Sequence, residues 1–229
     1  MNIQKMNIQK HIKDSVVIGI IGTFVLGVSF TGLEPRLSLA IEDQFTVTQT
    51  ITSEISFSTA SGDVVMTPSL GGVTGGTSNG TTTTVVLTND SAGYTMTIKA
   101  SSSPAMQGDS QGATISDYTP TSSSIPDFAF SVPTGAEFGY TVSASTTADL
   151  AQKFLDDGAT CNTGSADTSG SASCWYSLST TATSTILRTS ETSSSGSTSS
   201  IAFKLKINSG GFTVEDTYTA TATLTATTN

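Results

Sequence analysis

Histidine, cysteine and basic residues are scarce in this chain of 229 residues, which has one histidine, two cysteines and nine lysines and arginines. The single histidine, His11, lies near the N-terminus, so residues 41–229 contain none. Catalytic sets that depend on histidine, such as the Ser-His-Asp and Cys-His arrangements, are therefore excluded from that part. Two cysteines without histidine do not make a zinc site. We expect no metal, no cofactor and no enzymatic activity.

Positive charge is also scarce. The formal net charge is −9, and because residues 1–40 carry four basic and two acidic residues, residues 41–229 have a net charge of −11. An acidic surface with few cations repels phosphate, so we expect no nucleic acid among the partners. Charged residues make up 12% and aromatic residues 7% of the chain, and Ser and Thr fill most of the difference.

The first 40 residues have the pattern of an export leader. A basic N-terminus precedes an uncharged run, Ser15–Leu33, and the small residues Ser38 and Ala40 stand at the −3 and −1 positions of a cleavage site before Ile41. We therefore expect a hydrophobic leader helix in a signal peptide over residues 1–40, and one domain over residues 41–229. The uncharged run is also near the length of a membrane span, so a retained anchor is the alternative. Either way, only the leader would contact the membrane.

Apolar residues recur at every second position through most of the remaining sequence, which is the pattern of β-strands. Two hairpins are expected, one formed by Thr81–Asn89 with Gly93–Ser101 and one by Asp127–Val132 with Phe138–Ser145. Further strands are expected at Ser200–Asn208, with Lys204 and Lys206 facing outward, and from Asp216 to the end. One segment, Thr147–Gly158, instead has the pattern of a short helix.

Many short strands with turn signals between them predict an all-β fold. We expect a single antiparallel β-sandwich, immunoglobulin-like or jelly-roll-like, with one short helix; a β-barrel is the alternative. The stretch from Phe45 to Phe57 alternates over 13 residues, far longer than an average strand of about five or six. We expect it to lie in its own sheet. In the alternative, its first part, with Phe45, Val47 and Ile51, is donated to a neighbour's sheet.

The two cysteines, Cys161 and Cys174, enclose a segment rich in Gly, Ser and Thr. In an exported chain such a pair predicts a disulfide bond. Trp175 and Tyr176 follow directly, and on a strand they point to opposite faces. We expect one of them to be in the core and the other exposed. An exposed aromatic residue beside this segment is a candidate for sugar or partner binding, and ordinary packing is the favoured alternative. Tyr140 and Tyr118 are further candidates for ligand binding.

Carboxylates occur as neighbours at Glu42-Asp43, Asp156-Asp157 and Glu215-Asp216. Two carboxylates facing each other across a cleft would allow glycoside hydrolysis. Neighbours in sequence do not by themselves form such a pair, and we assign them no catalytic role.

Two stretches carry a family resemblance: TTTTVVLTNDSAGYTMTIKAS, at Thr81–Ser101, and the closing DTYTATATLTATTN. They resemble the Thr-rich β-sandwich proteins of bacterial cell surfaces, a loose group that includes WxL-type proteins and subunits of pilus-like or matrix fibres. The resemblance implies a secreted or cell-surface, non-enzymatic structural protein, an adhesin or a fibre subunit, whose partners are copies of itself or other surface proteins. The alternative is a secreted module that binds carbohydrate or another ligand through the aromatic residues above, with glycans as partners.

Overall fold

The computed structural model describes residues 41–168 and 173–229. The expected leader and its residues Ser38 and Ala40 lie outside the described residues. The chain divides into two units after Gln49. The described part of the first unit, residues 41–49, forms no helix or strand. Among the described residues, no helix is long and apolar enough to cross a membrane.

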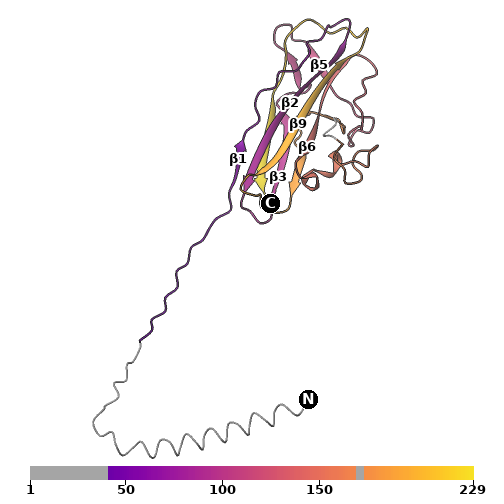
Figure 1. The fold of residues 1–229 in the computed structure, drawn as a ribbon. Helices are drawn as coiled ribbons and strands as arrows, with labels where there is room; N and C mark the ends of the chain where they lie inside the picture. Colours follow the sequence, from indigo (N-terminus) through magenta and orange to yellow (C-terminus); the bar gives the residue numbers. More distant parts are fainter. Residues whose placement is uncertain (1–40, 169–172) are drawn as a thin grey trace, which may run out of the picture. The chain divides into compact units, whose positions relative to one another are not determined.

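In the second unit, Thr50–Asn229, the regular secondary structure consists of β-strands apart from two 3-10 turns, which confirms the all-β prediction. Two long strands, β2 (Gly76–Thr88) and β9 (Ser197–Ile207), form the centre of the larger sheet with β6 (Ala136–Ala144). The sheet order is β1-β2-β9-β6-β5-β4-β10, and β7 also pairs with β6. Its other strands are β1 (Ile55–Thr59), β4 (Met106–Gly108), β5 (Thr114–Asp117), β7 (Tyr176–Ser177) and β10 (Tyr218–Ala220). Figure 1 shows β2, β9 and β6 side by side.

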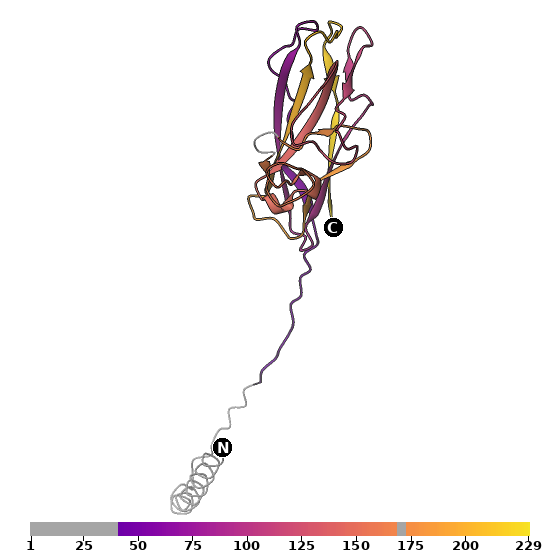
Figure 2. The same ribbon diagram turned by 90° about the vertical axis from the view of Figure 1, so that its right-hand side faces the viewer.

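The smaller sheet has the order β11-β3-β8 and is antiparallel. Its strands are β3 (Tyr94–Ala100), β8 (Thr183–Arg188) and β11 (Ala222–Thr228). The larger sheet is mixed, because β5 and β6 pair in parallel through Ser116 and Glu137. A single antiparallel sandwich is therefore not confirmed. Figure 2 shows the loops between β6 and β8 gathered on the side of the sheets that faces the viewer.

The main core contains buried side chains from both sheets. Met96 and Ile98 of β3, Ile186 of β8 and Ile201 of β9 are each at most 1% exposed. Along β9 the alternation of the sequence is kept: Ile201, Phe203 and Ile207 are buried, and the lysines between them are partly exposed. A second, smaller cluster consists of Tyr118, Val132 and Trp175, with Phe130 and Ala202 packed against it.

The first expected hairpin is wrong, although both of its strands exist. β2 pairs with β1 and β9, whereas β3 pairs with β8 and β11 in the other sheet. The turn between them thus crosses from one sheet to the other. The second expected hairpin is also wrong: between Asp127 and Val132 only Asp127 forms a β-bridge, with Trp175. β6 instead pairs with β9 over nine residues.

The expected helix Thr147–Gly158 is replaced by two short 3-10 turns, η1 (Thr147–Asp149) and η2 (Gln152–Phe154). The interruption has a clear cause: Leu150 bridges to Ile186, and the Ala151 N–H donates to the Thr185 carbonyl of β8 at 2.9 Å. This bond to the edge of β8 separates the two turns, each of which keeps its own local backbone hydrogen bonds. Leu150 and Phe154 of this segment are both buried.

The expected strand Phe45–Phe57 is wrong over most of its length. Residues 41–54 form no strand, and β1 begins only at Ile55. The register explains the boundary: Ile55 pairs with Thr88, the last residue of β2. Residues before Ile55 have no strand of this sheet beside them, because β2 ends at Thr88 and the chain then turns toward β3.

Candidate functional sites

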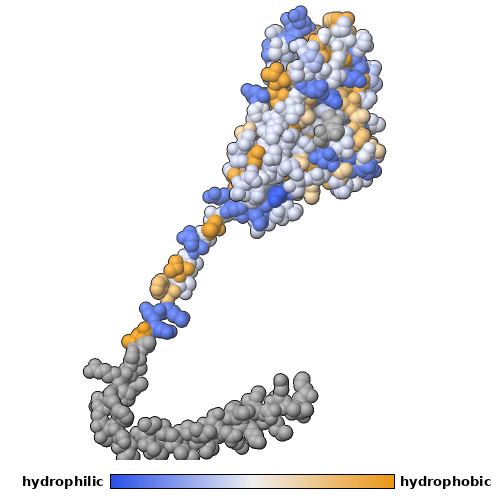
Figure 3. Space-filling model, in the orientation of Figure 1, coloured by the Kyte–Doolittle hydropathy of each residue, from blue (hydrophilic) through white to orange (hydrophobic). Residues whose placement is uncertain are grey.

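Among the described residues, those of the N-terminal segment, residues 41–54, include several exposed large apolar side chains. Phe45, Val47 and Ile51 are 84%, 83% and 83% exposed. In Figure 3 hydrophobic and hydrophilic residues alternate along this segment. The surface of the sheets is mostly of intermediate hydropathy, with small, separate hydrophobic groups. A folded surface seldom exposes several large apolar residues together unless they contact a partner.

The sheet end of this segment is held by the turn that follows β2. The side chain of Asn89 accepts a hydrogen bond from the Glu54 N–H at 2.7 Å and donates one to the Thr52 carbonyl at 3.0 Å. The Ser53 hydroxyl donates to Asp90 at 2.7 Å, and this bond is the main cause of the lowered pKa of Asp90. The turn thus determines where the chain leaves the larger sheet. The pair Asn89-Asp90 predicts a turn at this place in the sequence. Nothing in the sequence predicts that the turn binds Thr52, Ser53 and Glu54.

Of the four aromatic residues predicted for ligand binding, three are buried. Trp175 and Tyr118 are each 1% exposed and belong to the second cluster, and Tyr140 is 0% exposed in the main core. Burial raises the pKa of both tyrosines. Their ring faces are used in packing; Tyr118, for example, stacks on Phe130 with the ring centroids 4.4 Å apart. Tyr176 is partly exposed and packs against the main core, so the prediction of one core and one exposed residue holds for Trp175 and only in part for Tyr176.

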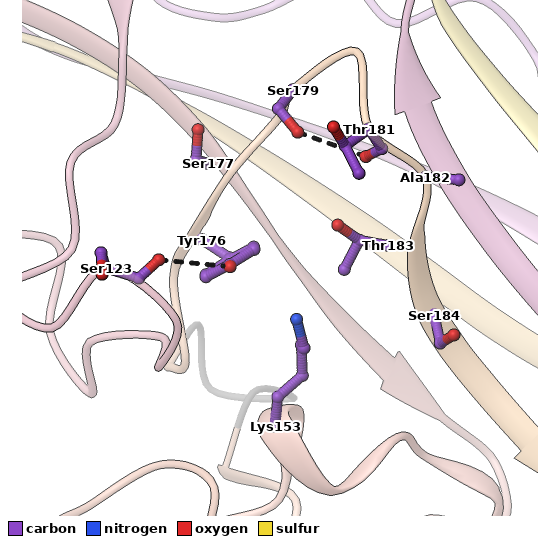
Figure 4. Close-up of a pocket in the computed structure, with 9 residues that line it drawn as sticks. All are labelled: Ser123, Lys153, Tyr176, Ser177, Ser179, Thr181, Ala182, Thr183 and Ser184. Carbon is purple, nitrogen blue, oxygen red and sulfur yellow. Dashed lines mark hydrogen bonds between the residues drawn. The ribbon is translucent and has the colours of Figure 1, made fainter.

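Tyr176 lies in a pocket of about 510 Å³ beside β7 and the start of β8. Its lining is rich in hydroxyl groups and contains one cation, Lys153 of η2 (Figure 4). The lining residues are Ser123, Lys153, Tyr176, Ser177, Ser179, Thr181, Ala182, Thr183 and Ser184. Lys153 was not predicted as a site residue, because the sequence pattern placed this lysine on a helix. The scarcity of lysine and arginine in the chain was the one feature that could have drawn attention to it.

The pocket residues are held by contacts to one another. The Lys153 Nζ lies 4.4 Å from the centroid of the Tyr176 ring, a cation–π contact, and the Tyr176 hydroxyl donates to the Ser123 carbonyl at 3.4 Å. Figure 4 shows the Lys153 ammonium directed into the space between these residues. Partial burial lowers the pKa of Lys153. Across residues 41–168 and 173–229 the one ion pair joins Arg188 to Asp149, so no carboxylate neutralises Lys153 there.

Cys161 and Cys174 form the predicted disulfide bond, and both are buried in the main core. Beside it, Asp156 is fully buried and accepts hydrogen bonds from the Gly158 N–H and from the N–H and hydroxyl of Thr168. The two bonds from Thr168, which lies between the cysteines, connect the disulfide loop to the turn after η2.

The neighbouring carboxylates do not face one another across a cleft. Asp157 accepts hydrogen bonds from the N–H groups of Ala159 and Thr160, and Asp216 accepts from Ser110 and Gln111. Glu42 and Asp43 lie in the N-terminal segment. Within the described part of the chain, no group of three or more histidine, cysteine, aspartate or glutamate side chains could hold a metal ion.

No model of a known protein family matches this chain, and neither a curated protein nor a solved structure matches it.

Proposed function

We propose that this protein is an exported, non-enzymatic structural protein of the cell surface or the extracellular space, which assembles into fibres through its N-terminal segment. One observation carries the proposal: Phe45, Val47 and Ile51 are exposed on an extended segment that forms no strand in its own sheet. The leader pattern of residues 1–40 and the disulfide bond support export, because disulfides persist in oxidising compartments.

Strand addition explains why such a segment would be kept. An extended peptide that pairs with the edge of another chain's sheet gains main-chain hydrogen bonds, and its alternate side chains fill pockets on one face. Phe45, Val47 and Ile51 stand at odd positions, so they share one face of any strand that the segment forms. Pairing with a second copy would bury the apolar side chains that are now exposed, and repeated pairing would form a fibre.

The test uses two double variants of the full chain. Phe45→Gln with Val47→Gln removes the apolar face, and Thr46→Gln with Thr48→Gln changes the opposite face of the same segment by the same residue type. We expect the unmodified chain and the threonine variant to form filaments or large oligomers in electron microscopy and sedimentation. The Phe45/Val47 variant should remain monomeric with an unchanged melting temperature, because none of the substituted residues lies in a sheet.

Two results would contradict the proposal. The first is an unmodified chain that stays monomeric at high concentration. The second is equal assembly of the two double variants, which would show that the apolar face of the segment is not used.

A further inference from the structure

The pocket beside Tyr176 has an unusual lining for a site of its size. Small-molecule pockets of roughly 300–1,000 Å³ are mostly lined by apolar residues. Here Ser and Thr side chains supply most of the lining, and the apolar contribution comes from Ala182 and the aromatic ring of Tyr176. An apolar ligand would therefore bury little matching surface. Hydroxyl groups both donate and accept hydrogen bonds, so this lining suits a ligand that itself carries many hydroxyl groups.

The positive charge of Lys153 favours a ligand that carries a negative charge. Its ammonium group lies over the Tyr176 ring at 4.4 Å, and within residues 41–168 and 173–229 it has no carboxylate partner. The ring restrains the position of the ammonium through its π face while leaving N–H groups available for a ligand. In a chain of net charge −11 over residues 41–229, an isolated cation in a pocket is the point at which an anion would bind. A single ammonium matches a single negative charge, such as that of one carboxylate.

From this geometry we infer that the pocket formed by Lys153, Tyr176 and the hydroxyl groups of β7 and β8 binds a saccharide that carries a carboxylate, such as a uronic acid residue. The carboxylate accepts hydrogen bonds from the Lys153 ammonium, and the sugar hydroxyls exchange hydrogen bonds with the Ser and Thr side chains. The pocket volume of about 510 Å³ accommodates one or two sugar rings. This binding is separate from fibre assembly, which involves residues 45–51.

The test is a titration of the full chain, purified in mild detergent, with D-glucuronate, and with D-glucose as the neutral match. NMR amide shifts report the affinity and show whether the affected residues lie between Tyr176 and Ser184. We expect glucuronate to bind about tenfold more tightly than glucose, because a charge-assisted hydrogen bond is lost with the neutral sugar. Acetate, which has the charge without the hydroxyls, should bind more weakly than glucuronate.

Three variants make the test specific to Lys153. Lys153→Met keeps the aliphatic stem and should weaken glucuronate binding about tenfold without changing the affinity for glucose. Lys153→Arg should retain most of the binding, and Lys99→Met, at an exposed lysine of β3, should retain all of it. If Lys153→Met does not fold, the comparison of glucuronate, glucose and acetate on the unmodified chain still decides the matter. Equal binding of the three ligands, no binding of glucuronate, or unchanged glucuronate binding by a folded Lys153→Met would each overturn the inference.

Discussion

Arg188 of β8 and Asp149 of η1 form an ion pair in which Nη1 lies 2.6 Å from Oδ2. The two side chains are 17% and 11% exposed, so the pair is largely buried. Arg188 also donates to the carbonyls of Ser190 and Glu191. The pair therefore joins the edge of the smaller sheet to the segment after β6 and to the loop after β8.

Breaking this pair should cost stability because it leaves a buried charge without a partner. We expect Asp149→Asn and Arg188→Met each to lower the free energy of unfolding by about 3 kcal/mol. The double variant should lose less than the sum of the two, since it leaves no lone charge. Denaturant unfolding of the three variants measures these values; strictly additive losses would show that the two side chains stabilise the fold independently.

The disulfide bond should stabilise the fold by restricting the unfolded chain. Cys161 and Cys174 are 13 positions apart, and the chain-entropy model gives about 3 kcal/mol for a loop of this size. We therefore expect Cys161→Ser with Cys174→Ser, or reduction of the unmodified chain, to lower the denaturant midpoint. Reductant should not affect the double variant, which serves as the control. An unchanged midpoint in both cases would mean that packing alone orders this loop.

Asp156 should make stability depend on pH in the acid range. Burial of its carboxylate raises the pKa, but hydrogen bonds from Thr168 and Gly158 outweigh this effect, so the pKa lies below its ordinary value. A carboxylate with a lower pKa in the folded state contributes stability above its unfolded pKa of about 3.9. That contribution is lost as the pH falls through the lower pKa of the folded state.

Asp156→Asn should therefore lose about 1–3 kcal/mol at neutral pH, because its amide cannot accept all of these hydrogen bonds. Below pH of about 3.9 the difference between the variant and the unmodified chain should shrink. Urea midpoints measured between neutral and acid pH check both statements. A difference that stays constant over this range would contradict the assignment.

Gly93 stands where the chain crosses between the two sheets, and its backbone is in the left-handed region with φ of 82°. A Cβ atom at this position would lie 2.2 Å from the Arg188 carbonyl oxygen. We expect Gly93→Ala to cost about 3 kcal/mol or more, from the backbone conformation and the overlap together. Gly112 is the matched control: its φ is 62°, but apart from its own atoms and its two chain neighbours no heavy atom lies within 4 Å of its Cβ position.

Gly112→Ala should cost only the backbone term of about 1–2 kcal/mol. Thermal unfolding of both variants measures the difference. Equal costs would show that the overlap at Gly93 is relieved by movement of the Arg188 backbone, and the crossing would then be less rigid than the structure indicates.

The strands of this protein were easier to predict than their partners. The alternation in Tyr94–Ala100 and Ser197–Ile207 reflects burial of one face, which is a local property of each strand. Backbone hydrogen bonds, by contrast, are the same for every residue except proline, so a strand carries no label for its neighbour. For this reason Thr81–Asn89 and Gly93–Ser101, which look like a hairpin, separate into two sheets. The closing stretch likewise divides into β10 and β11, which pair in different sheets.

In the candidate sites, too, local features could be predicted from the sequence and contacts between distant segments could not. The disulfide and the opposite faces of Trp175 and Tyr176 depend on composition and on neighbouring positions, and both were predictable. The pocket could not be predicted, because Lys153 reaches Tyr176 only after η1 and η2 replace the expected helix and bring the segment onto the edge of β8.

The sequence by itself determined that the chain is rich in β-strands, which residues of β9 face inward, and that its cysteines pair, since each follows from spacing or composition. Only the tertiary structure decided which strands meet and where the alternating stretch from Phe45 stops being a strand. That stretch has the pattern of a strand except at Gln49 and Ser53, where the apolar face is interrupted, but a strand needs a partner, and its partner β2 ends at Thr88.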